Sequence, residues 1–291
     1  MKRILITGVN SYLGKRFKDY MSARTGYATV SVSMRDGSWR NEDFHGFDVI
    51  YHVAGLAHSD SGRISKEKAQ KYYEINTELT EELAKKAKRE GVGQFIFMSS
   101  AIVYGDSAPL GSRRRIAPGT RCTPANCYSD SKLQAEERLK KLADERFKLV
   151  ILRPPMIYGP GCKGNYPVLS LFARKLPIFP KVNNERSMLY VDNLMEFVKL
   201  MIDNNEAGIF FPQNAEYSNT SELVRMIAEA HGKKLRLTGA FNWALKILRI
   251  FTPLVDKAFG SLSYDMSMSG YRQNYRLYSL EESIRITEGV Q

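Results

Sequence analysis

The chain opens with Lys2-Arg3-Ile4-Leu5-Ile6-Thr7-Gly8-Val9-Asn10-Ser11-Tyr12-Leu13-Gly14. A short apolar run leads into a glycine turn, and a helical pattern continues through Phe17 and Met21. Glycines let the backbone approach a ligand closely, and a helix N-terminus supplies amide donors and the positive end of a dipole. A dinucleotide fold binds its pyrophosphate at such a turn, although Ser11 stands where the motif usually has its middle glycine. An ordinary strand–turn–helix connection is the alternative interpretation.

Alternating strand and helix signals continue through the first half of the chain. We expect strands at 2–6, 28–33, 48–53, 93–98 and 148–153, and helices near 11–22, 75–90 and 127–144. Such alternation predicts an α/β fold with a doubly wound parallel (Rossmann) sheet. After Gly159-Pro160-Gly161 the elements become shorter and richer in Pro and Asn, so the organisation changes there.

Tyr128 and Lys132 are four residues apart in a segment with a helical pattern. Residues at this spacing share one face of a helix, so the ammonium of Lys132 can lie beside the Tyr128 ring and lower the pKa of its phenol. Ser100 follows the apolar run 94–98. Because ligands of parallel sheets collect at the carboxyl ends of the strands, Ser100 is expected to face the same crevice as the glycine turn. The alternative is a strand-end serine that binds local backbone groups.

Several motifs in order match a known family. They are Thr7-Gly8-x-x-Ser11-x-x-Gly14, His52-Val53-Ala54-Gly55, Asn76, Ser99-Ser100-Ala101-Ile102-Val103-Tyr104-Gly105, Tyr128-x-x-x-Lys132, and Arg153-Pro154-Pro155-Met156-Ile157-Tyr158-Gly159-Pro160. With them, nearly the whole chain resembles the extended short-chain dehydrogenase/reductases of the NAD-dependent epimerase/dehydratase family. The stretches 153–165 and 176–192 are similar to capsule and O-antigen enzymes that reduce or epimerise the C4 position of a nucleotide-linked sugar.

The resemblance implies roles for individual residues. Tyr128 is expected to give a proton to the sugar oxygen, Lys132 to lower the Tyr128 pKa and bind the nicotinamide ribose, and Ser100 to hydrogen-bond the reacting oxygen. The expected cofactor-binding residues are Gly8, Asn10, Ser11, Tyr12, Leu13, Gly14, Ser33, Arg35, Ala54, Gly55, Leu56, Tyr128, Lys132 and Pro155. The resemblance also implies a dinucleotide-binding domain at 1–160 and a mainly substrate-binding domain at 161–291, with one segment returning to the sheet.

The end of the second expected strand bears on the choice of cofactor. Enzymes that use NAD place an acidic side chain there to bind the ribose hydroxyls, whereas this strand ends at Ser33-Met34-Arg35. Ser33 and Arg35 could contact a 2′-phosphate instead, although Asp36 is close in sequence. We therefore expect NADP(H) ahead of NAD(H).

The preference for NADP(H) favours a reductase that acts on the C4 keto group of a UDP-linked 6-deoxy-4-keto amino sugar. A UDP-sugar 4-epimerase is the alternative, because the same three side chains serve both reactions. A non-catalytic dinucleotide-binding regulator is a distant third hypothesis. A dehydratase is disfavoured, because Ala101-Ile102 stands where that subgroup typically has an Asp-Glu pair.

Substrate contacts follow from the resemblance. Asn165 and Arg186 match residues that contact the nucleotide diphosphate, and Phe179 lies in a segment against which uracil packs. Each has a structural alternative: an Asn in a turn, an Arg on a solvated loop and a Phe in the core. His58 is expected either above the nicotinamide or on the surface.

Bulk properties set further limits. The 291 residues carry a net charge of +12, but no nucleic-acid-binding motif, metal-ligand pair, signal peptide or membrane span is evident. We attribute the charge to attraction of anionic substrate and cofactor. Three cysteines and the absence of a leader predict a cytoplasmic protein, and the family resemblance suggests a homodimer. Residues 241–259 contain an apolar stripe that we expect to pack against the substrate domain, with a peripheral membrane contact as the alternative.

Overall fold

The computed structural model describes residues 1–57, 64–240, 242–252 and 254–290. They form two compact units that alternate along the chain. Unit 1 contains residues 1–105, 121–154 and 195–211, and unit 2 contains residues 106–120, 155–194 and 212–291.

Unit 1 is built on a six-stranded parallel sheet with the order β10-β6-β4-β3-β1-β2. The strands are β1 (Lys2–Thr7), β2 (Tyr27–Val32), β3 (Val49–His52), β4 (Gln94–Met98), β6 (Lys148–Leu152) and β10 (Gly208–Phe210). Ile4 pairs with Thr29 on one side and with Val49 on the other, and it is fully buried. Strands that are buried on both faces have near-continuous apolar sequences, which explains why the inner strands of this sheet are easy to recognise from the sequence.

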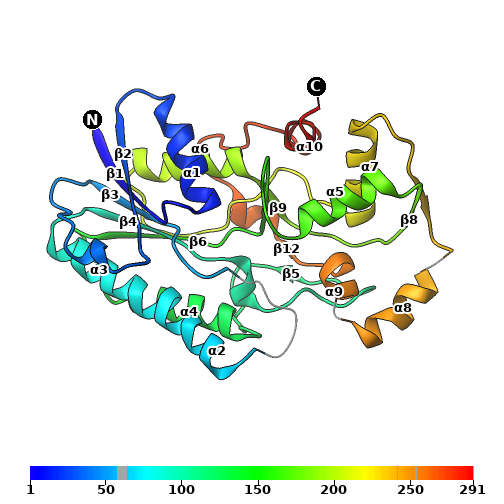
Figure 1. Ribbon diagram of the computed structural model, residues 1–291, viewed down its shortest axis with the longest axis horizontal. Helices are drawn as coiled ribbons and strands as arrows, with labels where there is room; N and C mark the ends of the chain where they lie inside the picture. The colour runs from blue at the N-terminus through cyan, green and yellow to red at the C-terminus, as the bar shows by residue number, and fades with distance from the viewer. Residues whose placement is uncertain (58–63, 241, 253, 291) are drawn as a thin grey trace. The chain divides into compact units, whose positions relative to one another are not determined.

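Helices cover both faces of this sheet (Figure 1). One face carries α1 (Tyr12–Ser22) and α6 (Val191–Asp203), which are joined by a 2.6 Å hydrogen bond from Tyr20 Oη to Glu196. The other face carries α2 (Lys66–Tyr73), α3 (Leu79–Arg89) and α4 (Cys127–Lys140). A π-helical turn, η2 (Glu74–Glu78), joins α2 to α3, so the two form one continuous helix. The short 3₁₀ turns are η1 (Ser38–Arg40) and η3 (Ala101–Tyr104).

Unit 2 combines short parallel strand pairs with helices. The pairs are β7 (Met156–Tyr158) with β9 (Met188–Tyr190), β8 (Ile178–Pro180) with β11 (Arg236–Thr238), and β5 (Arg115–Ile116) with β12 (Ser263–Tyr264). The helical elements are α5 (Asn165–Lys175), α7 (Thr220–Ala230), α8 (Asn242–Phe251), α9 (Leu254–Phe259), η4 (Met266–Ser269) and α10 (Leu280–Glu288).

The predicted α/β fold with a doubly wound parallel sheet is confirmed. The five predicted strands are β1, β2, β3, β4 and β6, and β10 completes the sheet. Among the described residues, every helix is too short or too polar to cross a membrane.

The expected packing of the apolar stripe in 241–259 is wrong for α8. No side chain of α8 is buried. The helix is held through polar contacts, because Asn242 Nδ2 donates to the Lys181 carbonyl at 2.8 Å and Arg249 lies 3.4 Å from Asp256 of α9. Most of its large apolar side chains remain exposed, and they are Trp243, Ile247, Leu248, Ile250 and Phe251.

Candidate active site

The glycine turn after β1 is tightly built. Ser11 caps α1, since its Oγ accepts a 3.0 Å hydrogen bond from the Gly14 amide. Gly8 has a φ of +80°, and a Cβ at Gly14 would lie 2.6 Å from Ser11 Oγ and 3.0 Å from the Gly8 carbonyl oxygen. Ser11 therefore replaces the usual glycine with a capping hydroxyl. Asn10 is exposed, while Tyr12 and Leu13 are half-buried in the first helical turn.

This turn fits a dinucleotide on structural grounds. Its two glycines let the backbone of the turn pack closely at the start of α1, where the amides of a first helical turn and the helix dipole favour a diphosphate. Gly8, Ser11 and Gly14 are the residues that would hold it.

Ser33, Arg35 and Asp36 follow the end of β2. Ser33 is half-buried and Arg35 is exposed. Asp36 Oδ1 accepts hydrogen bonds from Ser38 Oγ at 2.7 Å and from the Ser38 amide at 3.2 Å, and these bonds lower the pKa of Asp36. The acid that complicated the choice of cofactor is thus engaged in its own turn.

A buried chain of three side chains supports the loop after β3. Thr7 Oγ1 accepts the amides of Val53 and Ala54, both at 3.1 Å, and lies 2.8 Å from His52 Nδ1. The Thr7 hydroxyl must therefore donate to Nδ1, so His52 carries its proton on Nε2 and donates to Thr80 Oγ1 at 2.9 Å. Burial lowers the His52 pKa to about 3, so the ring stays neutral near pH 7.

The same loop is held against α4 by Asn76. Asn76 is fully buried in η2; its Oδ1 accepts the Leu56 amide at 2.8 Å, and its Nδ2 donates to the Leu56 carbonyl and to Ser131 Oγ, both at 3.2 Å. A Cβ at Gly55 would lie 2.9 Å from Asn76 Oδ1 and 3.4 Å from Lys132 Nζ. This loop therefore needs a glycine beside Lys132. His58 lies outside the described residues.

The structure brings Ser100 and Tyr128 together. The Ser100 side chain hydrogen-bonds the phenol of Tyr128, and Ser100 Oγ also accepts the Ile102 amide at 3.3 Å. Ser100 therefore contacts the Tyr128 phenol and also caps its local backbone, and its role as a site residue stays a prediction. The Tyr72 ring lies 5.8 Å from the Tyr128 ring, centroid to centroid.

Lys132 lies on α4, one helical turn after Tyr128. Its Nζ donates to the Met98 carbonyl at 2.9 Å and lies 4.7 Å from the centre of the Phe97 ring. Burial lowers the pKa of Lys132 to about 8, while Glu136, one turn further along α4, opposes that change.

The expected lowering of the Tyr128 pKa is not what the structure shows. Burial raises the pKa of Tyr128 to about 12, and the hydrogen bond from Ser100 opposes the rise. Lys132 is not among the causes of the Tyr128 pKa shift, because its ammonium donates to the Met98 carbonyl instead. Tyr128 is therefore a protonated phenol at neutral pH.

An ion pair beneath Lys132 escaped sequence analysis. Glu136 is fully buried and accepts Arg153 Nε at 3.0 Å; Arg153 Nη1 donates to the Tyr104 hydroxyl at 2.7 Å. Ser99 Oγ donates to the same carboxylate at 2.5 Å. The available signal was a Glu at helical spacing from Lys132 and an Arg directly after an apolar strand, but neither predicts its partner.

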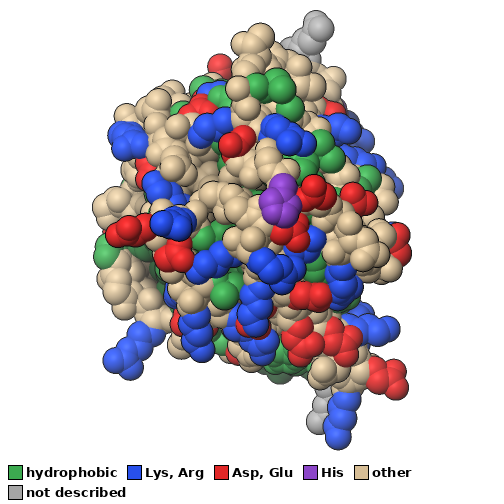
Figure 2. All heavy atoms as spheres, turned by 90° about the vertical axis from the view of Figure 1, so that its left-hand side faces the viewer, with side chains coloured by type: hydrophobic (Ala, Val, Ile, Leu, Met, Phe, Trp, Pro, Cys, Tyr) green, Lys and Arg blue, Asp and Glu red, His purple; other side chains and the backbone are tan. Residues whose placement is uncertain are grey.

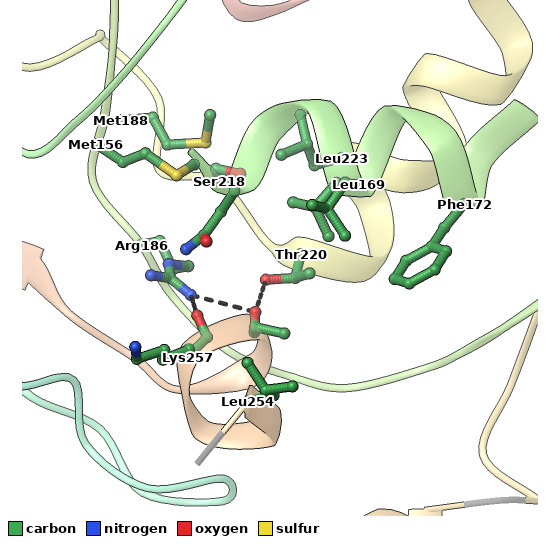
Figure 3. A pocket seen from close by; sticks show the side chains of 13 residues that line it. Met156, Leu169, Phe172, Arg186, Met188, Ser218, Thr220, Leu223, Leu254 and Lys257 are labelled. Carbon is green, nitrogen blue, oxygen red and sulfur yellow. Dashed lines mark hydrogen bonds between the residues drawn. The ribbon is translucent and has the colours of Figure 1, made fainter. Parts of the chain in front are cut away.

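Unit 2 holds a cavity of about 220 Å³ to which Asn165 and Arg186 both contribute (Figure 3). Arg186 Nη1 donates to the carbonyls of Lys257 at 2.6 Å and Ala258 at 3.2 Å, and Thr220 Oγ1 donates to the Ala258 carbonyl at 2.8 Å. Apolar side chains complete the wall, and they are Met156, Val168, Leu169, Phe172, Met188, Leu223 and Leu254.

Arg186 lacks a counter-ion within the part of the chain that the structure describes. Burial lowers the pKa of Arg186, and no carboxylate among the described residues offsets this effect. A cation in a largely apolar cavity is best satisfied by an anionic ligand.

Two predicted site residues lie elsewhere in unit 2. Phe179 is 4% exposed and packs against Phe172 and Phe259, with ring centres 6.4 and 5.7 Å away, so it belongs to the core and is absent from the cavity wall. Pro155 is half-buried immediately before β7.

Comparison with known proteins gives consistent matches. The profile described as "NAD dependent epimerase/dehydratase family" matches residues 4–210. A UDP-glucose 4-epimerase of Vibrio cholerae is 30% identical over 91% of this chain and 88% of its own length. An N-acetyl-alpha-D-glucosaminyl-diphospho-ditrans,octacis-undecaprenol 4-epimerase of Escherichia coli O157:H7 is 29% identical over 80% of this chain and 70% of its own length.

A reductase and a solved structure extend this set. The UDP-2-acetamido-2,6-beta-L-arabino-hexul-4-ose reductase of Pseudomonas aeruginosa is 24% identical over 82% of this chain and 60% of its own length. The crystal structure of UDP-glucuronic acid 4-epimerase from Bacillus cereus in complex with NAD has a TM-score of 0.75 at 17% identity, covering 99% of this chain and 96% of that one. At that identity the structural likeness shows the fold.

Proposed function

Because the chain belongs to the NAD-dependent epimerase/dehydratase family, we propose that it reduces the C4 keto group of a UDP-linked 6-deoxy-4-keto sugar. The observation that carries the proposal is the hydrogen bond between Ser100 and Tyr128, made beside the loop that Thr7 and Asn76 hold against Lys132. A bound nicotinamide would supply the hydride for this chemistry.

Tyr128 supplies the proton in this proposal. Its raised pKa keeps the phenol protonated at neutral pH, which is the state needed to deliver a proton to the oxygen as C4 becomes a hydroxyl. The Ser100 hydroxyl holds the same oxygen and stabilises the phenolate that remains. Lys132 binds the cofactor ribose and, with a pKa of about 8, is mainly cationic at neutral pH.

The cavity in unit 2 is the proposed site for the UDP part of the substrate. Arg186 Nη1 is committed to two carbonyls, so Nε and Nη2 are the atoms left for a diphosphate. Asn165 opens α5 at the same cavity and adds an amide donor. The apolar wall of the cavity suits the flat face of the uracil base.

The end of β2 supports NADPH as the reductant. Asp36 is occupied by Ser38, and the guanidinium of Arg35 is exposed where a 2′-phosphate could bind. We place the reaction in a cytoplasmic, reducing environment, supported by three free cysteines. Its proposed role is to supply sugars for surface polysaccharides, supported by the E. coli relative named for a lipid-diphosphate substrate.

A cofactor-oxidation assay tests the proposal. The enzyme is mixed with NADPH or NADH and a panel of UDP-4-keto sugars, and loss of reduced cofactor is compared with the amount of hydroxyl product. We expect stoichiometric NADPH consumption for at least one sugar. Failure to oxidise either cofactor with every sugar would reject the reductase assignment.

A UDP-sugar 4-epimerase is the second candidate, favoured by the relatives from V. cholerae and E. coli, both named as 4-epimerases. It predicts nicotinamide that copurifies with the enzyme and interconversion of C4 epimers without added reductant. Product analysis of UDP-sugars incubated with enzyme alone distinguishes the two reactions.

A further inference from the structure

Helix α8 exposes an apolar face that we call the α8 face, made of Trp243, Ile247, Leu248, Ile250, Phe251 and Leu254 at the start of α9. Trp243 is 64% exposed, Ile250 77% and Phe251 79%. Their spacing places them along one side of the helix. Six exposed apolar side chains gathered on α8 and the start of α9 indicate an interaction surface, whereas single apolar residues scattered over a surface do not.

The segments that contain and adjoin α8 are rich in basic residues. Residues 168–181 and 231–257 are brought together by the pairing of β8 with β11 and by the hydrogen bond from Asn242 to Lys181. Together these two segments contain nine Lys and Arg but a single acid, Asp256, which pairs with Arg249. They also expose apolar side chains of their own, including Leu176 at 41% and Ile178 at 45%.

This charge distribution is not general to the surface. Figure 2 shows a face on which basic and acidic side chains are interspersed. Unit 1 pairs many of its cations, for example Arg40 with Glu82 and Lys88 with Asp144. Eight of the twelve excess positive charges therefore lie in the two segments that contain and adjoin α8.

We propose that the α8 face docks the protein onto the surface of an anionic phospholipid bilayer. Trp, Phe and aliphatic side chains enter the boundary between headgroups and acyl chains, and the Lys and Arg of the two segments bind anionic headgroups. Leu254 belongs both to the α8 face and to the wall of the cavity in unit 2, so docking brings that cavity close to the membrane. The inference goes beyond the proposed function, because it concerns where the enzyme acts and holds for either reaction at C4.

Tryptophan emission gives a direct test on the intact protein. The chain has two tryptophans, of which Trp39 is fully buried and Trp243 is exposed. Vesicles of equal parts phosphatidylcholine and phosphatidylglycerol should shift the emission to shorter wavelength and carry the protein into the vesicle pellet. Vesicles of phosphatidylcholine alone should do so much more weakly, with affinity changing about fivefold for each cation that engages an anionic lipid.

Variants separate docking from nonspecific adsorption. The double variant Ile250→Glu/Phe251→Glu should abolish both signals while leaving turnover unchanged, since both side chains are exposed and outside the cavity. The matched control is Ile286→Glu, an exposed apolar residue on α10 of the same unit, which should bind vesicles like the wild type.

Three results would overturn the proposal. They are absence of binding to the anionic vesicles, binding that survives the double variant, and an emission shift that appears without lipid as protein concentration rises. If the last result is obtained and sedimentation also shows a dimer that the double variant disrupts, the α8 face binds a second copy of the chain.

Discussion

At Tyr128, burial and a hydrogen bond act in opposite directions on one phenol. Burial raises its pKa to about 12, and Ser100 limits that rise by stabilising the phenolate. The residue is therefore set up to hold a proton until an acceptor oxygen reaches it.

Replacing Tyr128 with Phe removes the proton donor and keeps the ring. We expect Tyr128→Phe to lower kcat by about 10²- to 10⁴-fold, the usual contribution of a positioned acid, while cofactor affinity measured by titration stays unchanged. The control is Tyr73→Phe, which removes a phenol bonded to Asp130 at 2.9 Å and should keep most activity. Near-normal turnover in Tyr128→Phe would contradict the assignment.

Lys132 makes stability depend on pH. Its pKa is about 8 in the folded chain against an ordinary value of 10.5, so between these values the unfolded chain binds a proton that the folded chain has released. The contribution of Lys132 to the free energy of unfolding therefore rises with pH across this window, and below it the buried ammonium costs on the order of 3 kcal/mol.

Urea denaturation of the wild type and Lys132→Met from about pH 7.5 to about pH 9.5 measures this effect. As pH rises across this window, the wild type should gain stability relative to the variant. The free energy of unfolding of the wild type minus that of the variant should therefore increase with pH. A difference between the two proteins that is constant with pH would show that Lys132 does not titrate there.

The ion pair between Glu136 and Arg153 is a buried pair, with side chains 0% and 6% exposed. Glu136→Gln leaves an uncompensated guanidinium, so we expect a loss of about 3–5 kcal/mol in the free energy of unfolding. Glu137→Gln is the control, because Glu137 pairs with Lys140 on the exposed side of α4 and should cost at most about 1 kcal/mol. Equal losses by urea denaturation would show that burial of the pair is not decisive.

At the scale of elements, α4 carries two of the candidate catalytic side chains, Tyr128 and Lys132, and begins with a capping box. Asn126 Oδ1 accepts the Ser129 amide at 3.0 Å, and Ser129 Oγ accepts the Asn126 amide at 3.1 Å. Because Tyr128 lies in the first turn of the helix, the cap also fixes the position of its phenol.

Asn126→Ala should cost about 1 kcal/mol of stability and also lower kcat, because the first turn of α4 loosens. Ser279→Ala removes the equivalent cap of α10 and should cost a similar amount of stability with turnover unchanged. Thermal denaturation and kcat measured together test both effects. A variant Asn126→Ala with full turnover would contradict the link between cap and phenol.

Elements with strong local signals were predictable from the sequence, and others were not. The inner strands β1, β3, β4 and β6 are largely buried, so their apolar runs are clear, whereas the edge strand β2 is only partly buried and was indicated by its β-branched residues. Helix α2 was missed because Lys66-Glu67-Lys68-Ala69-Gln70-Lys71 shows no apolar period. A segment returning to the sheet was expected, but the position of β10 was missed, because its three residues become a strand only through pairing with β6, far away in sequence.

The candidate site divides in the same way. The turn at Gly8, together with Tyr128 and Lys132, belongs to local motifs, so the order and spacing of these motifs and the family resemblance indicated it. The pairs Thr7 with His52 and Glu136 with Arg153 depend on which strands and helices become neighbours, which no local pattern states. The exposure of α8 was equally hidden, since an amphipathic pattern identifies an apolar face without saying what covers it.

At the scale of the whole molecule, the predicted site residues lie in both compact units. Ser100, Tyr128 and Lys132 belong to unit 1, whereas Asn165 and Arg186 belong to unit 2. Hydride chemistry and substrate recognition are thus proposed for different parts of the chain. The suggested homodimer stays a prediction.

The π-helical turn at Glu74–Glu78 limits which insertions and deletions this part of the sequence can accept during evolution. Each residue of an α-helix turns the chain by about 100°, so deleting one residue to straighten the helix would swing α2 around its axis. That rotation would carry Tyr72 away from Tyr128 and part the amide of Asn76 from Leu56. Natural selection should therefore remove length changes within this helix.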